Sequence, residues 1–137
     1  QQQQQDGGGG GTGTSPRAPA EPLVQYIPYA ARLAERHPDP AVRYRIIMLL
    51  CARATAVTQT LAECLNDERR FVRRASARML GQIGEYSISA MLRADGDSDT
   101  PRKKMIADTA VPALIDSLRD PDAEVRKVVC GALTQFG

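Results

Sequence analysis

The sequence predicts an all-α fold, a row of about three helical hairpins stacked side by side. From Pro22 onward, apolar residues recur at helical spacing, and no hairpin turn is flanked by alternating apolar residues. Aromatic residues make up only 4% of the chain and Trp is absent, which argues against a β-sandwich. A segment containing Val72-Arg73 also recurs, in similar form, around Val125-Arg126. Repetition of a helical unit indicates hairpins that bury their apolar faces against one another.

The first 21 residues differ in composition from the rest. Gln1–Gln5 and Gly7–Gly11 are followed by Thr, Ser, Pro and Ala, and nothing in this block can nucleate a core. We expect residues 1–21 to form a disordered Gln/Gly-rich tail and residues 22–137 to form the repeat domain.

The repeats are located by fixed spacings. The two clearest copies lie 53 residues apart and align Asp67 with Asp120 and Leu80 with Leu133. A looser first copy places Val42-Arg43 30 residues before the second copy. The predicted repeats span about 23–54, 55–84 and 109–137.

Each copy reads as a helix, a tight turn and a second helix. Asp67 and Asp120 are placed in the turn to accept hydrogen bonds from free backbone N–H groups. The second helix is expected over about 70–83 in the middle copy and 124–136 in the last, with Gly84 as its terminating glycine. One face of the middle helix carries the predicted core stripe Val72, Ser76, Met79, Leu80 and Ile83.

An insertion separates the second and third copies, over about 85–108. Residues 88–92 could form a short amphipathic turn, and 94–104 read as an exposed loop rich in Asp, Ser and Lys. Thr100 precedes Pro101, so it is a candidate site for proline-directed phosphorylation.

These copies resemble the HEAT repeats of the armadillo-like α-solenoids. Pro112, Asp120, Val125-Arg126 and Leu133 carry the resemblance in the last copy, and Asp67, Val72-Arg73 and Leu80 carry it in the middle one. The resemblance implies a short right-handed solenoid. It also implies a ladder of ion pairs between neighbouring repeats, formed here by Arg43, Asp67, Arg73, Asp120 and Arg126.

The charge pattern offers two candidate surfaces for a partner. The chain carries 15 Arg but only 3 Lys, and Arg favours planar, partly buried pairs. Arg69, Arg70, Arg74 and Arg78 form a dense cluster that is either solvated surface or a site for an acidic partner. The second candidate surface is the last helix around Lys127, Cys130 and Thr134.

Signals of catalysis are weak. His37 is the only histidine and precedes a proline, as expected for a turn residue. Asp95, Asp97 and Asp99 fail the calcium-loop pattern at its sixth and twelfth positions. We therefore expect no catalytic residue, metal, cofactor or small-molecule substrate. The three cysteines lack a metal-site spacing, and we expect buried, reduced thiols in the cytoplasm or nucleus.

We therefore expect the protein to be a non-catalytic scaffold that binds other proteins, and to be part of a longer array of repeats. The segment 46–52 is apolar nearly all round, so we expect something to cover it. No apolar run is long enough to predict a membrane span. The repeats look most like those of type-2A phosphatase scaffold subunits. Two alternatives stay open: a chromatin- or nucleic-acid-associated HEAT subunit using the Arg cluster, and an enzyme with the HEAT-like repeats of bilin lyases.

Overall fold

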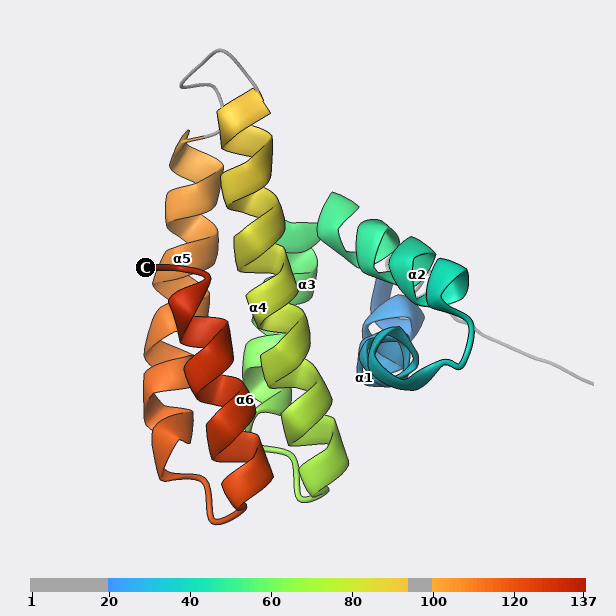
Figure 1. Ribbon diagram of the computed structural model, residues 1–137, viewed down its shortest axis with the longest axis vertical. Helices are drawn as coiled ribbons and strands as arrows, with labels where there is room; N and C mark the ends of the chain where they lie inside the picture. The colour runs from blue at the N-terminus through green and yellow to red at the C-terminus, as the bar shows by residue number, and fades with distance from the viewer. Residues whose placement is uncertain (1–19, 94–99) are drawn as a thin grey trace, which may run out of the picture.

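The computed structural model describes residues 20–93 and 100–137, and the side chains within 24–87 and 101–137. This part of the chain is helical, as predicted (Figure 1). Its elements are α1 (Ala20–Arg36), α2 (Pro40–Ala52), α3 (Ala54–Cys64), α4 (Arg70–Arg93), α5 (Thr100–Asp116), a 3₁₀ turn η4 (Ser117–Arg119) and α6 (Ala123–Thr134). The tail expected over residues 1–21 lies almost entirely outside the described residues.

The second and third hairpins stack in register. The α3–α4 hairpin lies beside the α5–α6 hairpin, with α3 against α5 and α4 against α6 (Figure 1). The predicted core stripe of α4 is fully buried in this stack. Leu61, Leu80, Leu114 and Val129 fill the interior between the four helices. The register of these two hairpins fixes which side chains of α4 and α6 face each other.

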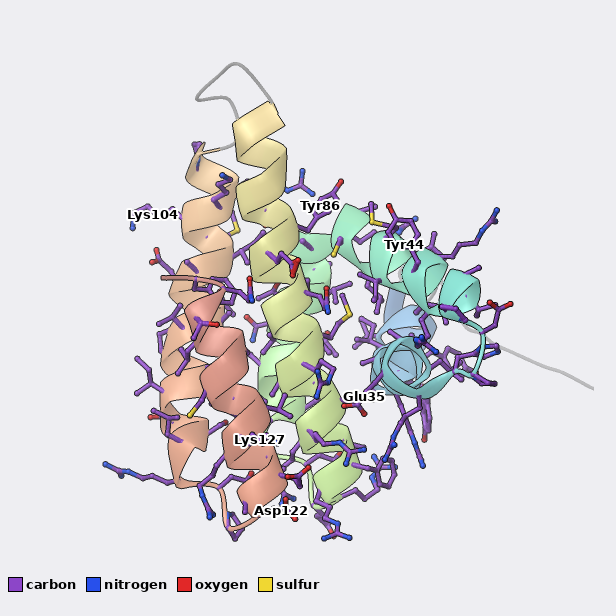
Figure 2. The ribbon with its side chains drawn as sticks, in the orientation of Figure 1. Glu35, Tyr44, Tyr86, Lys104, Asp122 and Lys127 are labelled. Atoms are coloured by element: carbon purple, nitrogen blue, oxygen red, sulfur yellow. The ribbon has the colours of Figure 1, made fainter. Side chains whose placement is uncertain are left out.

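The first hairpin is turned relative to the other two. Its leading helix α1 packs mainly on α4 rather than on α3, and α2 projects away from the stack (Figure 1). Arg53 alone separates α2 from α3, and the two helices meet at 105°. Large apolar side chains are exposed on this hairpin, among them Tyr44 at 64% and Leu49 at 68%. Figure 2 shows Tyr44 on α2.

Among the described helices, none is by itself long and apolar enough to cross a membrane. Helices α2 and α3 together have the length and apolar composition of such a span, but they are bent by 105°.

The described part of the insertion is helical, because α4 continues to Arg93 and α5 begins at Thr100. The expected loop over 94–104 is therefore wrong for residues 100–104, whereas residues 94–99 lie outside the described part of the chain. The two extensions run side by side (Figure 1). Gly84 therefore does not terminate a helix. It lies inside α4, where an added Cβ would come within 3.0 Å of the Phe136 ring, so it serves close packing against the end of α6.

Candidate functional site

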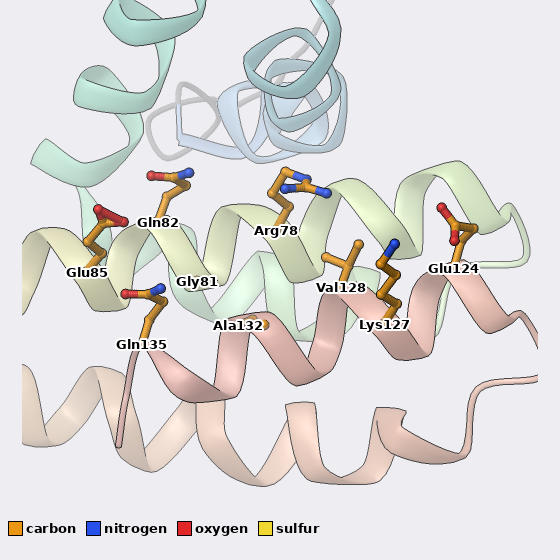
Figure 3. Close-up of a pocket in the computed structure, with 10 residues that line it drawn as sticks. Arg78, Gly81, Gln82, Glu85, Glu124, Lys127, Val128, Ala132 and Gln135 are labelled. Atoms are coloured by element: carbon orange, nitrogen blue, oxygen red, sulfur yellow. The ribbon is translucent and has the colours of Figure 1, made fainter.

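An open groove of about 320 Å³ runs between α4 and α6 (Figure 3). Its α4 side carries Arg78, Gln82 and Glu85, and its α6 side carries Glu124, Lys127 and Gln135. Within the described residues, Glu85, Glu124 and Lys127 form no ion pair, and the side chains of Gln82 and Gln135 form no hydrogen bond. Charged and amide groups that lack partners among the described residues are available to another molecule.

Small residues form the floor of the groove. Gly81 of α4 faces Ala132 of α6, and a Cβ on Gly81 would lie 3.0 Å from the Ala132 Cα. The two helix backbones therefore approach closely only because position 81 is glycine. Gly131 differs, because a Cβ there would meet nothing within 4 Å. Its backbone is left open on the groove wall.

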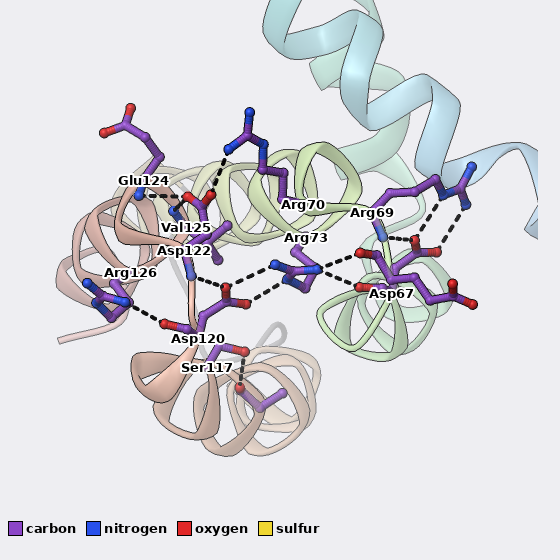
Figure 4. A network of polar contacts seen from close by, with 12 residues as sticks. Asp67, Arg69, Arg70, Arg73, Ser117, Asp120, Asp122, Glu124, Val125 and Arg126 are labelled. Carbon is purple, nitrogen blue, oxygen red and sulfur yellow. Dashed lines mark hydrogen bonds and ion pairs between the residues drawn. The ribbon is translucent and has the colours of Figure 1, made fainter.

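A buried ion pair fixes the spacing of the two helices at the turn end of the groove (Figure 4). Arg73 Nε lies 2.7 Å from Asp120 Oδ2, and a terminal nitrogen of Arg73 lies 3.1 Å from Oδ1. The side chains are only 13% and 5% exposed. The remaining terminal nitrogen donates to the carbonyl oxygens of Asp67 and Glu68 at 2.9 and 3.0 Å. Arg73 therefore joins its own turn to the next one through bidentate geometry.

The same arginine position ties down the turn in all three hairpins. Arg43, Arg73 and Arg126 each donate to the carbonyl oxygen six residues earlier, on His37, Asp67 and Asp120. The repeat spacing in the sequence already aligned these three arginines with one another. The structure shows in addition that each of them donates a hydrogen bond to the turn of its own hairpin.

The side chains of the turn also accept backbone hydrogen bonds, as expected for Asp67 and Asp120. Asp67 Oδ1 accepts from the N–H of Arg69 at 2.8 Å, and Asp120 Oδ1 accepts from the N–H of Asp122 at 2.9 Å. In the first hairpin His37 takes this role, with Nδ1 accepting from the N–H of Asp39 at 3.0 Å. His37 stands 30 residues before Asp67, so the repeat spacing could have revealed this substitution.

The expected ladder has a rung between hairpins two and three but none between one and two. Arg43 does not reach Asp67 among the described contacts. Arg69 instead binds the Asp67 carboxylate through two nitrogens, both at 3.0 Å, and holds the pKa of Asp67 below its ordinary value. The prediction that Arg43 and Asp67 pair is wrong because the first hairpin is turned away from the second.

All four candidate partner-binding arginines of the cluster have carboxylates beside them. Besides the Arg69–Asp67 pair, Arg70 lies 3.2 Å from Asp122. Arg74 and Arg78 share Glu35 at 3.3 and 3.0 Å, and Figure 2 shows Glu35 on the α1 side of α4. Sequence reasoning missed Glu35 because it comes from the first hairpin, whose orientation no spacing predicted.

The other candidate residues are spread over α5 and α6. Lys127 lines the groove, whereas Thr134 is exposed outside it and donates to the carbonyl of Gly131 at 2.6 Å. Thr100 is the first residue of α5, and its side chain lies outside the described part.

The three cysteines differ in exposure. Cys51 is buried, and burial, with a smaller effect of Glu85, raises the pKa of its thiol to about 11. Cys64 is partly buried, and burial raises its pKa too. Cys130 is exposed, so the expectation of three buried thiols is wrong for this residue. Within the described residues, no three His, Cys, Asp or Glu side chains form a group that could hold a metal ion.

Two family models match the chain. One describes HEAT repeats and covers residues 27–108, and the other describes a HEAT repeat and covers residues 110–137. The chain belongs to the HEAT-repeat family. A search of curated proteins found no match. HEAT repeats typically form non-catalytic helical scaffolds for contacts between proteins, and the described residues form helical hairpins of this kind.

The first HEAT match begins at Ile27, inside α1, so it includes the turned hairpin. The α1–α2 unit is therefore a repeat in an unusual orientation. The insertion also lies within this match, up to Asp108. The HEAT pattern thus accommodates both departures from regular stacking.

Proposed function

We propose that this HEAT-repeat protein is a non-catalytic scaffold that holds a segment of a partner protein in the groove between α4 and α6. The observation that carries the proposal is the set of side chains along this groove that lack partners within the described part of the chain. They comprise carboxylates at Glu85 and Glu124, an ammonium at Lys127 and amides at Gln82 and Gln135. Alternating amides and charges suit the backbone and polar side chains of a bound segment.

The identity of the partner is a finer proposal. The segment from Val72 to Leu80 and the run Val111-Pro112-Ala113-Leu114 look most like repeats of type-2A phosphatase scaffold subunits. We propose on this basis that the chain belongs to a phosphatase scaffold or regulatory subunit. A phosphatase catalytic subunit among the captured partners would support this assignment.

Position 131 allows the groove to be blocked without disturbing the fold. A side chain at Gly131 enters open space, so Gly131→Gln should fold normally and project into the groove. The matched control is Cys130→Gln, which places the same side chain on the neighbouring exposed position outside the groove.

Affinity capture from the source cell, with mass spectrometry, is the measurement. Partners bound by the native protein and by Cys130→Gln should be lost from Gly131→Gln. Retention of every partner by Gly131→Gln, with its helical circular dichroism unchanged, would place the binding surface elsewhere.

The Arg cluster supports the alternative function less well. A site for nucleic acid needs cations free to neutralise phosphates, and each of these four arginines lies beside a carboxylate. Arg69 and Arg70 are the most accessible test positions that leave the Glu35 contacts intact. Nucleic-acid binding by the native protein that is lost in Arg69→Glu/Arg70→Glu, and that falls steeply with salt, would favour this alternative.

A further inference from the structure

A second hollow, of about 290 Å³, lies where the helical extensions of the insertion meet the α2–α3 junction. Cys51, Ala52 and Ala54 contribute the junction side, and Tyr86 and Ser87 come from the extension of α4. The first turns of α5 supply Arg102, Lys103 and Ile106. The insertion therefore builds most of the polar wall of this pocket.

The wall is cationic. It carries the guanidinium of Arg102, the ammonium of Lys103 and the hydroxyls of Tyr86 and Ser87, and no carboxylate belongs to the eight lining residues. The Cys51 thiol stays neutral at physiological pH because its pKa is raised to about 11. Glu85, the acidic residue of α4, does not line this pocket, although it lies close enough to Cys51 to contribute to the raised pKa of that thiol. It is exposed and lines the groove toward α6.

Lys103 is the decisive group. Its Nζ atom is buried and has no hydrogen-bond partner among the described residues. The neighbouring Lys104 behaves differently, because it is exposed and its Nζ lies 3.0 Å from Asp108. Figure 2 shows Lys104 on the side of α5 away from α2, whereas Tyr86 lies on the side of α4 toward α2. A buried ammonium without a counterion is unfavourable, and a bound anion would compensate it.

We propose that this pocket binds a phosphate group, held by Lys103 and Arg102 with hydrogen bonds from Tyr86 and Ser87. Two cations in one pocket match the charge of a phosphate dianion better than that of a single carboxylate. The pocket also adjoins the first turn of α5, where the helix dipole favours an anion. The phosphate group could belong to a small molecule or to a phosphorylated partner segment.

The test compares Lys103→Met with Lys104→Met in the full chain. Lys103→Met removes the buried charge and keeps the apolar stem, so it should fold and should raise the melting temperature without ligand. Inorganic phosphate should raise the melting temperature of the native protein and of Lys104→Met, but not of Lys103→Met. Calorimetric affinity for phosphate should fall by at least about tenfold in Lys103→Met alone.

A phosphoserine peptide and its unphosphorylated form separate the two sources of the phosphate group. Binding of the phosphopeptide well above that of inorganic phosphate, lost in Lys103→Met, assigns the pocket to a partner protein. Equal affinities assign it to a small phosphorylated compound. Absence of phosphate binding by the native protein, or equal binding by both variants, would overturn the proposal.

Discussion

The boundary between the second and third hairpins differs from the boundary between the first and second. At the former, α4 lies along α6, and the buried Arg73–Asp120 pair joins two successive turns. At the latter, α1 packs on α4, and Glu35 is shared by Arg74 and Arg78. The same arginine position ties down its own turn in every hairpin, yet it reaches the next turn only where the hairpins stack in register. The ladder is therefore a result of regular stacking.

The two boundaries differ because the segments that connect the hairpins differ in length. A single residue, Arg53, separates α2 from α3, and the chain bends there by 105°. Between the second and third hairpins, the long extensions of α4 and α5 give the chain room to return in register. The two hairpins joined by the long helices α4 and α5 therefore stack in register. The hairpin that is joined to the next one by a single residue is turned.

Loss of the ladder rung should have the largest effect on stability. Arg73→Ala leaves Asp120 buried without its cation and should lower the free energy of unfolding by about 3 kcal/mol. Arg43→Ala removes one hydrogen bond to the His37 carbonyl and should cost about 1 kcal/mol. Urea denaturation followed by circular dichroism measures both.

A double-mutant cycle isolates the interaction itself. Arg73→Ala and Asp120→Ala should show a coupling energy, whereas Arg43→Ala and Asp67→Ala should be additive. Coupling between Arg43 and Asp67 as strong as that between Arg73 and Asp120 would mean that the first hairpin stacks in register in solution.

Loss of the ion pairs of Glu35 should have the next largest effect on stability. Glu35→Gln weakens both of its ion pairs with α4 and should destabilise the protein by about 1–2 kcal/mol, since Glu35 is only 9% exposed. Arg78 is half exposed and contributes the smaller share. Hydrogen exchange should quicken in α1, while α5 and α6 stay protected. Uniform loss of protection would show that the first hairpin unfolds together with the rest.

Replacing the two glycines of the groove with alanine should change the stability of the protein in opposite directions. Gly81→Ala forces a Cβ against the Ala132 backbone at 3.0 Å and should destabilise the α4–α6 contact by about 1 kcal/mol despite better helix propensity. Gly131→Ala meets open space and should stabilise the protein by about 0.5–1 kcal/mol. Thermal unfolding of the two variants provides the comparison, and equal shifts would contradict the close approach of the helices.

The helical hairpins, the buried stripe of α4 and the turn positions of Asp67 and Asp120 could be predicted from the sequence. They depend on local periodicity and on a spacing that repeats along the chain. The orientation of the first hairpin could not, because it depends on how α1 packs against α4 rather than on its own sequence pattern. Glu35 and the missing Arg43–Asp67 rung follow from that orientation. The helical start of α5 over residues 100–104 could not be predicted either, because the polar composition of this segment is typical of a loop and its helix depends on packing between α4 and α5.

The acid response of the cap at α6 is the smallest expected effect. Asp122 accepts from the N–H groups of Glu124 and Val125, at 2.8 and 3.1 Å, and these backbone bonds together with Arg70 hold the pKa of Asp122 below its ordinary 3.8. A carboxyl whose pKa is lowered by folding stabilises the native state above the unfolded pKa, and this stabilisation is lost as the pH falls through the folded value. Asp122→Asn keeps a capping oxygen, so it should change stability little at pH 7 and should flatten the loss of stability below about pH 4. Asp39, which caps α2 through the N–H of Ala41, has no arginine partner among the described residues, and Asp39→Asn is the matched control. Equal flattening of the melting temperature in both variants would mean that the pairing with Arg70 and the second backbone bond contribute nothing to the acid response.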